Sequence, residues 1–271
     1  MSTIEAIVLG LVQGLTEFLP ISSSGHLRIV PAFLGWDDPG AAFTAVTQLG
    51  TMAAVLLYFR EDLWNISRTW TRSLRDPALR DQKDARMGWF ILLGTIPIGV
   101  FGLAFRNQIE DGARDLYLIG TALIVLGLIL LVAEKKSKRE RGVESLTLRD
   151  AIMVGFAQAL ALVPGVSRSG ATITAGLFLG LDRASAARFS FLLSVPAVVL
   201  SGLFQLPDAL DGGSIGAAPL ALATLLAFVS GYASIAFLLH FLVSHSTGVF
   251  VVYRVGLGAA VLALVGAGAI S

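Results

Sequence analysis

Residues 13–26, which read QGLTEFLPISSSGH, gather polar side chains inside an apolar part of the chain. Burying Glu17 in a membrane would cost about 2.5 to 3.5 kcal/mol on insertion scales, and such residues usually serve a function. Ser23 and His26 lie close together further along the same segment. A hydroxyl beside an imidazole suits nucleophilic attack assisted by a general base. The segment therefore predicts an acid, a nucleophile and a base for a single site.

A second polar segment, residues 164–172 with the sequence PGVSRSGAT, contributes a cation. Pro164, Gly165 and Ser167 indicate the start of a helix, which places Arg168 at its N-terminus. A positive side chain there adds to the positive end of the helix dipole, which is unfavourable unless an anion binds. Phosphate or pyrophosphate fits best, because a guanidinium engages two oxygens at once. An internal ion pair between Arg168 and Glu17 is the alternative.

Both segments are expected to be helices broken near the middle. Pro20 lacks an N–H group and restricts the residue before it, so a helix ends there. The serines at 22–24 then favour a new helix start. Gln13 and Glu17 are four residues apart and share one face of the first helix. The result is a helix end that faces a helix start, with polar groups on both.

The two segments also resemble each other. Residues 10–25 align with residues 155–170 without a gap, although the prolines fall one place out of register. The matched pairs are Gly10 with Gly155, Gln13 with Gln158, Leu15 with Leu160, Ser22 with Ser167, Ser24 with Ser169 and Gly25 with Gly170. Among the differences are Glu17 against Leu162, Ser23 against Arg168 and His26 against Ala171. Each copy therefore carries groups that the other lacks.

Composition indicates an integral membrane protein. Of 271 residues, 55% are hydrophobic and only 14% charged, and the mean hydropathy is +0.77. The chain has no cysteine, which excludes disulfides and thiolate metal sites. A net charge of +1 without a basic cluster interleaved with aromatics gives no sign of a nucleic-acid surface. The N-terminus lacks the basic region and cleavage site of a removable signal peptide.

The apolar runs predict an all-α fold of six transmembrane helices plus two re-entrant helical hairpins. Runs long enough to cross a hydrocarbon core of about 30 Å lie near 41–59, 88–105, 116–133, 186–205, 218–241 and 248–270. The broken segments near 3–34 and 150–181 have halves too short to cross. Non-helical backbone at membrane depth is tolerated when it is buried in protein or lines a cavity. We therefore expect the two breaks to meet inside the bundle.

Charge predicts the orientation. Residues 60–86 and 134–149 are rich in Lys and Arg, which places them in the cytoplasm. The opposite loops carry Asp37, Asp38, Glu110, Asp111, Asp115, Asp208 and Asp211. Three spans between the hairpins make the halves antiparallel, as pseudo-repeats 3–133 and 150–270 of one membrane domain joined by the loop 134–149. Inverted repeats with broken helices place their site near the midplane. Arg28, Arg183, Arg188 and Arg254 are expected to reach the headgroup region.

The residues of both segments resemble the undecaprenyl-pyrophosphate phosphatase family, the bacitracin-resistance type of bacterial inner-membrane enzyme. The resemblance implies hydrolysis of a C55 isoprenoid pyrophosphate to its monophosphate, which recycles the lipid carrier of peptidoglycan synthesis. It carries function onto Glu17, Ser23, His26, Ser167, Arg168 and Thr172. Gln13, Ser22, Ser24 and Ser169 are further candidate substrate-binding residues. Gln13 stands where the family pattern has Glu or Gln, which weakens a metal site built on two carboxylates.

Two mechanisms stay open. Either Ser23 attacks phosphorus with His26 as base, which we favour, or His26 attacks directly. Glu17 would orient His26 or help hold a divalent cation such as Mg²⁺ or Ca²⁺. The entry of the first hairpin from outside favours a pocket on the outer side, and the sequence is compatible with a homodimer. A transporter or flippase of polyprenyl phosphate is the alternative function, because its architecture would be the same.

Overall fold

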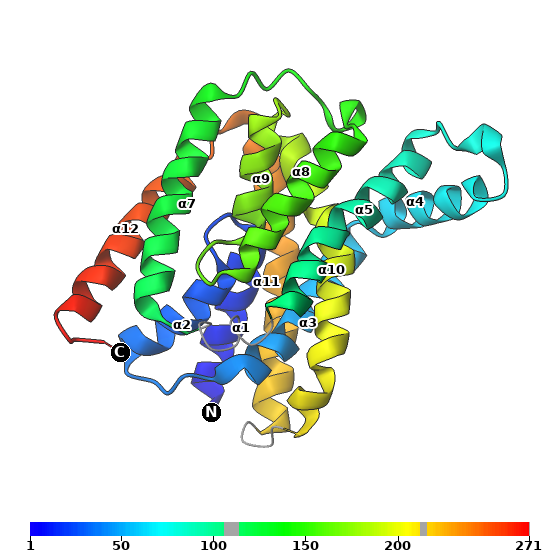
Figure 1. The fold of residues 1–271 in the computed structure, drawn as a ribbon. Helices are drawn as coiled ribbons and strands as arrows, with labels where there is room; N and C mark the ends of the chain where they lie inside the picture. The colour runs from blue at the N-terminus through cyan, green and yellow to red at the C-terminus, as the bar shows by residue number, and fades with distance from the viewer. Residues whose placement is uncertain (106–113, 212–215, 271) are drawn as a thin grey trace.

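A computed structural model describes residues 1–105, 114–211 and 216–270, and the side chains of all of these except 41, 42 and 201–211. These residues form helices and no β-strand (Figure 1). The helices are α1 (Thr3–Phe18), α2 (Ser23–Leu34), α3 (Gly40–Tyr58), α4 (Arg60–Ser73), α5 (Lys83–Ala104), α7 (Leu116–Lys136), α8 (Leu148–Ala159), α9 (Arg168–Phe178), α10 (Arg183–Asp211), α11 (Ala217–Ser244) and α12 (Gly248–Gly266), with 3₁₀ turns at Pro77–Leu79, Val143–Ser145 and Leu160–Leu162.

Five of the described helices are long and apolar enough to cross a membrane. They are α5, α7, α10 over Arg183–Leu200, α11 and α12. The described side chains of α3 form a shorter apolar helix, Phe43–Tyr58. By length and composition the chain is therefore a multi-pass membrane protein of the all-α class.

The helix breaks lie where the sequence predicted them. α1 ends at Phe18, before Pro20, and α2 begins at Ser23 with Ser22 as its N-cap. In the second segment α8 ends at Ala159, and α9 begins at Arg168. Both breaks leave a short irregular loop between two helices, and Figure 1 shows these loops inside the bundle rather than at its surface.

Glycines allow the broken helices to approach their neighbours closely. A Cβ atom at Gly14 of α1 would clash with Ser230 of α11. A Cβ atom at Gly155 of α8 would clash with the backbone of Gly94 in α5. Small residues at such crossings are typical of membrane helices, where close backbone packing replaces the hydrophobic effect. α1 is thereby held against α11, and α8 against α5.

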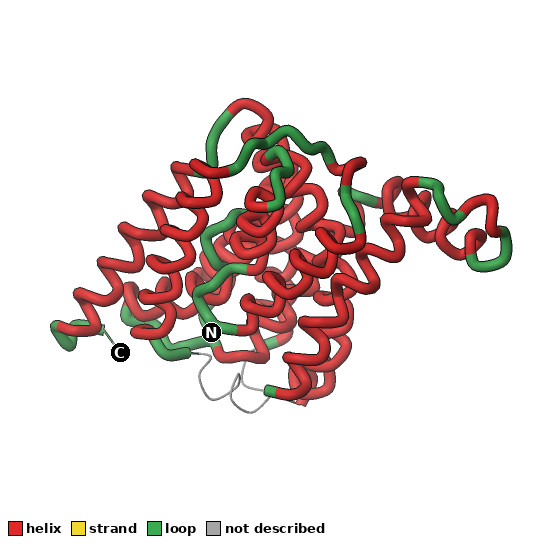
Figure 2. The backbone as a smooth tube through the Cα atoms, turned by 45° about the horizontal axis from the view of Figure 1, so that its top comes forward, coloured by secondary structure: helices red, strands yellow, loops and turns green. Residues whose placement is uncertain are grey.

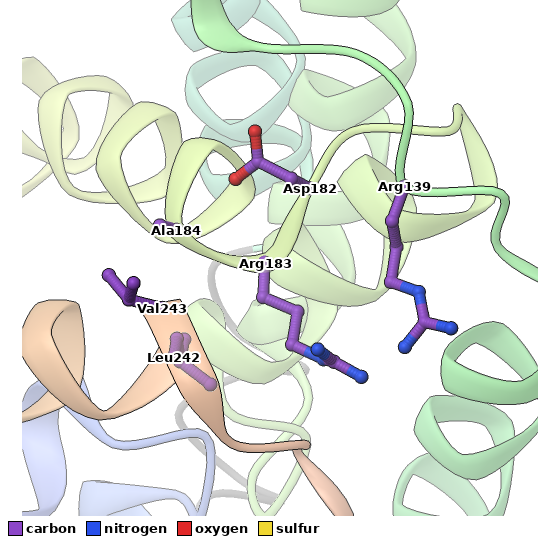
Figure 3. Close-up of a pocket in the computed structure, with 6 residues that line it drawn as sticks. All are labelled: Arg139, Asp182, Arg183, Ala184, Leu242 and Val243. Atoms are coloured by element: carbon purple, nitrogen blue, oxygen red, sulfur yellow. The ribbon is translucent and has the colours of Figure 1, made fainter.

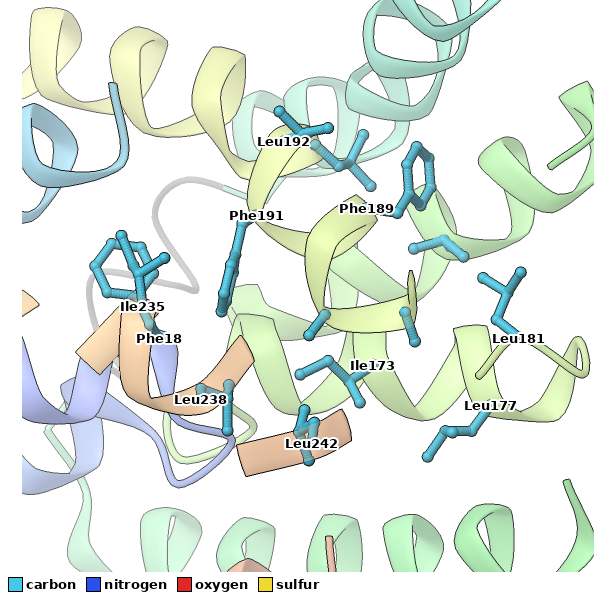
Figure 4. Packing of buried hydrophobic residues seen from close by; sticks show 14 of the residues in the cluster. Phe18, Ile173, Leu177, Leu181, Phe189, Phe191, Leu192, Ile235, Leu238 and Leu242 are labelled. Atoms are coloured by element: carbon cyan, nitrogen blue, oxygen red, sulfur yellow. The ribbon is translucent and has the colours of Figure 1, made fainter. Parts of the chain in front are cut away.

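The largest apolar cluster joins the two halves of the chain (Figure 4). Phe18, at the end of α1, packs edge-on against Phe191 of α10, with ring centroids 5.4 Å apart and ring planes at 81°. Ile173 of α9 and Leu238 of α11 belong to the same cluster. The end of α1 and the helix that begins with Arg168 are therefore fixed by a common packed core.

Much of the basic segment 60–86, expected as a cytoplasmic loop, is helical. α4 has a narrow apolar face on which Ile66 and Trp70 lie one turn apart, and Trp70 packs edge-on against Trp89 of α5. α4 and the first turns of α5 extend away from the bundle as an arm (Figures 1 and 2). The apolar pairing explains why this charged segment folds instead of remaining a loop.

The two ends of the chain lie on one side of the bundle, and the loop between α7 and α8 lies on the other (Figure 1). The basic loop thus lies opposite the two ends, and which side faces the cytoplasm stays a prediction from charge. Of the acidic loop residues used in that argument, Glu110 and Asp111 lie outside the described residues, as do the side chains of Asp208 and Asp211.

A buried carboxylate fixes the start of α8. Thr147 and Asp150 form a capping box, and Arg141 Nη2 donates to Asp150 Oδ2 at 2.6 Å. Burial alone would raise the pKa of the Asp150 carboxyl, but hydrogen bonds from Arg141 and Thr147 outweigh it and lower that pKa below its usual value. Asp150 therefore stabilises the fold as an anion.

Asp150→Asn will lower the stability of the protein in a pH-dependent way. A carboxyl whose pKa is depressed by folding stabilises fully above its unfolded pKa of about 3.9, and this contribution is lost as the pH falls through the lower folded value. The difference in melting temperature between wild type and variant should thus shrink below about pH 4. Thermal unfolding in detergent at several pH values, with Asp76→Asn at an exposed cap as control, measures it. A difference that does not depend on pH would contradict this account.

Candidate active site

Glu17 lies at the centre of the candidate site, in the last turn of α1, with its side chain 5% exposed. Gln13 Nε2 donates to Glu17 Oε2 at 3.2 Å, and Gln48 Nε2 of α3 donates to Oε1 at 3.4 Å. Ser23 Oγ donates to Glu17 Oε2 at 2.5 Å. A carboxylate that accepts a hydrogen bond from a serine hydroxyl is placed to take its proton.

Arg168 reaches the same carboxylate from the other broken helix. It is the first residue of α9, and its Nη2 forms an ion pair with Glu17 Oε1. The tips of the two broken helices thus meet, as expected from the sequence. Among the described residues, the guanidinium of Arg168 has no other hydrogen-bond acceptor. Its remaining N–H groups are therefore available to an anion such as a phosphate.

The loops that follow the two helix breaks have the same geometry. Ser22 and Ser167 are the N-caps of α2 and α9, with φ angles of 76° and 71°. Positive φ is uncommon for residues other than glycine. Ser22 Oγ accepts from the Gly25 N–H at 3.3 Å, and Ser167 Oγ accepts from the Gly170 N–H at 3.1 Å. Two helix starts therefore bring unpaired N–H groups of their first turns to the site.

Three other candidate binding residues differ in what they contact. Ser24 is exposed and lies beside the Ser22 hydroxyl. Ser169 Oγ donates to the Leu19 carbonyl at 3.0 Å, which ties the second loop to the first. Thr172 is buried and donates to the Arg168 carbonyl at 2.8 Å. These contacts place Thr172 behind Arg168, where it supports the first turn of α9.

His26 is buried beside this cluster, one turn into α2. Its Nδ1 lies 2.7 Å from the Ser22 carbonyl oxygen and its Nε2 lies 2.6 Å from the Tyr253 hydroxyl of α12. The sequence suggests Glu17 as a group that orients the imidazole. In the structure Ser22 and Tyr253 make that contact instead, because α2 turns His26 toward α12.

Arg254 corrects a prediction from the sequence. It was expected to reach the headgroup region, but it is 0% exposed. Its guanidinium donates to carbonyl oxygens from three parts of the chain. These are Pro20 in the first loop, Gly165 and Val166 in the second loop, and Ala122 and Leu123 in α7. Arg254 therefore holds the two loops of the site together.

Arg254→Met will destabilise the protein strongly. The substitution fills much of the same volume but leaves five buried carbonyls without their donor, and breaking a buried charged network costs about 3 to 5 kcal/mol. The expected result is a large fall in melting temperature in detergent. Arg188→Met is the matched control, because Arg188 pairs with Asp62 and is 42% exposed. Equal melting temperatures for the two variants would rule out this role for Arg254.

Sequence reasoning missed Gln48, Tyr253 and the role of Arg254. Each is a polar residue within an apolar run, which marks it as a candidate for a buried contact. The sequence does not indicate which residue it contacts. Gln158 is the corresponding residue to Gln13 in the second segment, and both of its side-chain polar atoms are buried without a hydrogen-bond partner among the described residues. Its counterpart Gln13 contacts Glu17, whereas position 162 is leucine and offers no such acceptor.

A hollow on the surface lies elsewhere in the molecule. It has a volume of about 380 Å³ and is lined by Arg139, Asp182, Arg183, Ala184, Leu242 and Val243 (Figure 3). The guanidinium of Arg183 is held by Glu134, which is buried and also accepts from the Thr247 hydroxyl at 2.8 Å. None of the lining residues belongs to the cluster around Glu17.

Comparison with known proteins identifies the family. The model of the family "Bacitracin resistance protein BacA" matches residues 6–260. The chain belongs to this family. A relative named undecaprenyl-diphosphatase from Mycolicibacterium smegmatis is 58% identical over 275 residues, which cover 100% of this chain and 99% of the relative. Another of that name from a Nocardioides species is 55% identical over 269 residues, covering 99% and 98%. Undecaprenyl-diphosphatase 2 of Streptomyces coelicolor is 51% identical over 283 residues, covering 100% and 97%.

Proposed function

We propose that this membrane protein hydrolyses undecaprenyl diphosphate to undecaprenyl phosphate and inorganic phosphate, as the names of its relatives indicate. This reaction recycles the lipid carrier of cell-wall synthesis and accounts for resistance to bacitracin in the family. One observation carries the proposal for this chain. A serine hydroxyl and an arginine guanidinium share one buried carboxylate at the meeting point of two helix starts.

Substrate binding is the first step of the proposed mechanism. The pyrophosphate binds Arg168 and the N–H groups at the starts of α2 and α9. The pyrophosphate competes with Glu17 for the guanidinium of Arg168, because both are anions. A carboxylate released from its ion pair is a better proton acceptor. Binding of the correct anion therefore converts Glu17 from a partner of Arg168 into a base for Ser23.

Ser23 then attacks the terminal phosphorus. Its Oγ forms a new P–O bond while its proton passes to Glu17, and the bond from that phosphorus to the bridging oxygen breaks. Undecaprenyl phosphate leaves with the electron pair, and a water molecule hydrolyses the phosphoserine to release inorganic phosphate. Arg168 and the helix N–H groups stabilise the charge on the transferred phosphoryl group throughout.

Glu17 takes the role of base in this proposal because of where the hydrogen bonds run. Ser23 donates to Glu17 at 2.5 Å, whereas both ring nitrogens of His26 are engaged by Ser22 and Tyr253. Direct attack by His26 Nε2 would require its hydrogen bond with Tyr253 to break. The contacts therefore favour Ser23 as nucleophile, as the sequence did, but with Glu17 in place of His26 as the base.

A divalent cation fits the site only with help from the substrate. In the part of the chain that the structure describes, no group of three or more His, Cys, Asp or Glu side chains could hold a metal ion. Mg²⁺ commonly binds one or two carboxylates together with substrate phosphates. Glu17 would be the protein ligand of such an ion, which would neutralise charge on the phosphates of the substrate.

We further propose that the fold is an inverted repeat of residues 3–133 and 150–270, with α3 as the sixth span and the broken helices as re-entrant hairpins. The equal cap geometry of Ser22 and Ser167 supports it. So does the packing: α1 lies on α11 of the second half, and α8 lies on α5 of the first. In this arrangement the protein lies in the bacterial inner membrane with the pocket open to the outer side.

Phosphate release by the purified protein tests the proposed activity. The protein in detergent should release inorganic phosphate from undecaprenyl diphosphate, and the Glu17→Gln variant should release almost none. A transporter of polyprenyl phosphate is the other candidate, and it would give no release from either protein. The same preparation must first show a cooperative thermal transition, so that absence of release is not confused with unfolding.

A further inference from the structure

The pairing of His26 with Tyr253 has no place in the mechanism above. The two rings are stacked, with centroids 5.6 Å apart and planes 6° from parallel, and His26 Nε2 lies 2.6 Å from the Tyr253 hydroxyl. The residues come from α2 and α12, 227 positions apart. His26 is 5% exposed, whereas Tyr253 is 44% exposed. The partly exposed Tyr253 therefore holds the buried imidazole of His26 in place.

The hydrogen bonds define which ring nitrogen of a neutral His26 carries the proton. The Ser22 carbonyl can only accept, so Nδ1 of His26 carries the proton that it receives. In a neutral ring Nε2 is then an acceptor, and the Tyr253 hydroxyl is its donor. Each nitrogen has one partner, and the tyrosine ring lies nearly parallel to the imidazole beside its Nε2 edge. His26 consequently has a single orientation.

That orientation reaches the nucleophile through the backbone. The carbonyl held by His26 belongs to Ser22, the N-cap whose φ of 76° is unfavourable for serine. Ser23 is the next residue, and its side chain must remain aimed at Glu17. In the second loop the residue that corresponds to His26 is Ala171, whose side chain cannot form a hydrogen bond to the Ser167 carbonyl. The strained start of α2 thus has a support that the start of α9 lacks.

We propose that Tyr253 is a positioning residue of the active site, acting through His26 on the loop that presents Ser23. This inference rests on the proposed hydrolysis and names a residue that the mechanism itself does not need. The Tyr253 hydroxyl donates to His26 Nε2 and so fixes the plane of the imidazole, and His26 Nδ1 in turn fixes the Ser22 carbonyl. Tyr253 itself transfers no proton to the substrate.

Two substitutions separate the contributions. Tyr253→Phe keeps the stacked ring and removes the hydroxyl, so kcat should fall about tenfold with KM within about twofold. Tyr253→Leu removes both, and kcat should fall about 100-fold, the effect of misplacing a reacting group by about 1 Å. Tyr117→Phe on α7, where the side chain is also exposed, is the matched control and should retain wild-type kcat.

A spectroscopic measurement tests the contact independently of activity. In ¹⁵N-histidine-labelled protein, the Nε2 resonance of His26 should move toward the value of an unbonded lone pair in Tyr253→Phe, while Nδ1 remains protonated. An unchanged Nε2 resonance, or wild-type kcat in both Tyr253 variants, would overturn the inference. If wild type itself releases no phosphate, the proposed hydrolysis fails instead, and the resonance shift still reports whether Tyr253 orients His26.

Discussion

Arg168→Ala will reduce phosphate release by about 10³-fold or more. Arg168 is the cation that the second broken helix brings to the site, and its free N–H groups face no other acceptor among the described residues. Phosphoryl transfer depends mostly on positioning and charge stabilisation, so removal of this guanidinium affects kcat as well as binding. Steady-state release of phosphate from undecaprenyl diphosphate measures the loss.

Two further variants show whether the loss has the proposed cause. Arg168→Lys retains the charge but not the two-oxygen contact, and it should still lose about 100-fold. Arg168→Ala leaves Glu17 buried without its ion pair, which destabilises the fold. The double variant Glu17→Gln with Arg168→Met should regain a wild-type melting temperature while remaining inactive. Wild-type turnover in Arg168→Lys would show that a diffuse positive charge suffices.

Ser23→Ala will abolish turnover, and acid-quenched wild type will contain a phosphorylated serine at position 23. Ser23 Oγ is the hydroxyl that donates to Glu17 at 2.5 Å, and no other residue offers that combination in the described site. Glu17→Gln should slow formation of the intermediate by about 10² to 10⁴-fold, the usual loss when a general base is removed. Rapid quench with labelled substrate, followed by peptide mass spectrometry, measures both.

The acid stability of the phosphorylated residue distinguishes the two candidate nucleophiles, Ser23 and His26. Phosphoserine survives acid, whereas phosphohistidine is lost in acid and stable in base. Label that resists acid and maps to residue 23 supports the mechanism; label recovered only after basic quench and mapped to His26 replaces it. Ser67→Ala, at an exposed position on the α4 arm, is the matched control and should leave the intermediate unchanged.

The broken helices could be predicted because their causes are local. Pro20 ends a helix wherever it stands, and Ser22 and Ser167 cap the helices that follow them. The meeting of the two breaks was expected because irregular backbone at membrane depth must be buried in protein, and the ion pair of Glu17 with Arg168 was the alternative considered for Arg168. A charge in an apolar segment needs a partner, and the sequence offered few candidates at the same depth.

The partners supplied by α12 could not be predicted, because they depend on how that helix is rotated. Tyr253 and Arg254 are neighbours in sequence, yet one is 44% exposed and the other 0%. Nothing in the apolar run around them indicates which faces the loops. Gln48 is similar, since its contact with Glu17 depends on the packing of α3 against α1. Local patterns thus specify where a helix begins, and tertiary packing specifies what it touches.

The position of Arg254 bears on how the molecule can move. A protein that transports a lipid across the bilayer alternates between two conformations, and its two halves rock about the binding site. Here one guanidinium is bonded to Pro20 in the first half and to Gly165 and Val166 in the second. Any rocking that separates these loops would strand a cation in the dry centre of the bundle. The hydrogen bonds of Arg254 therefore oppose a motion that separates the two loops.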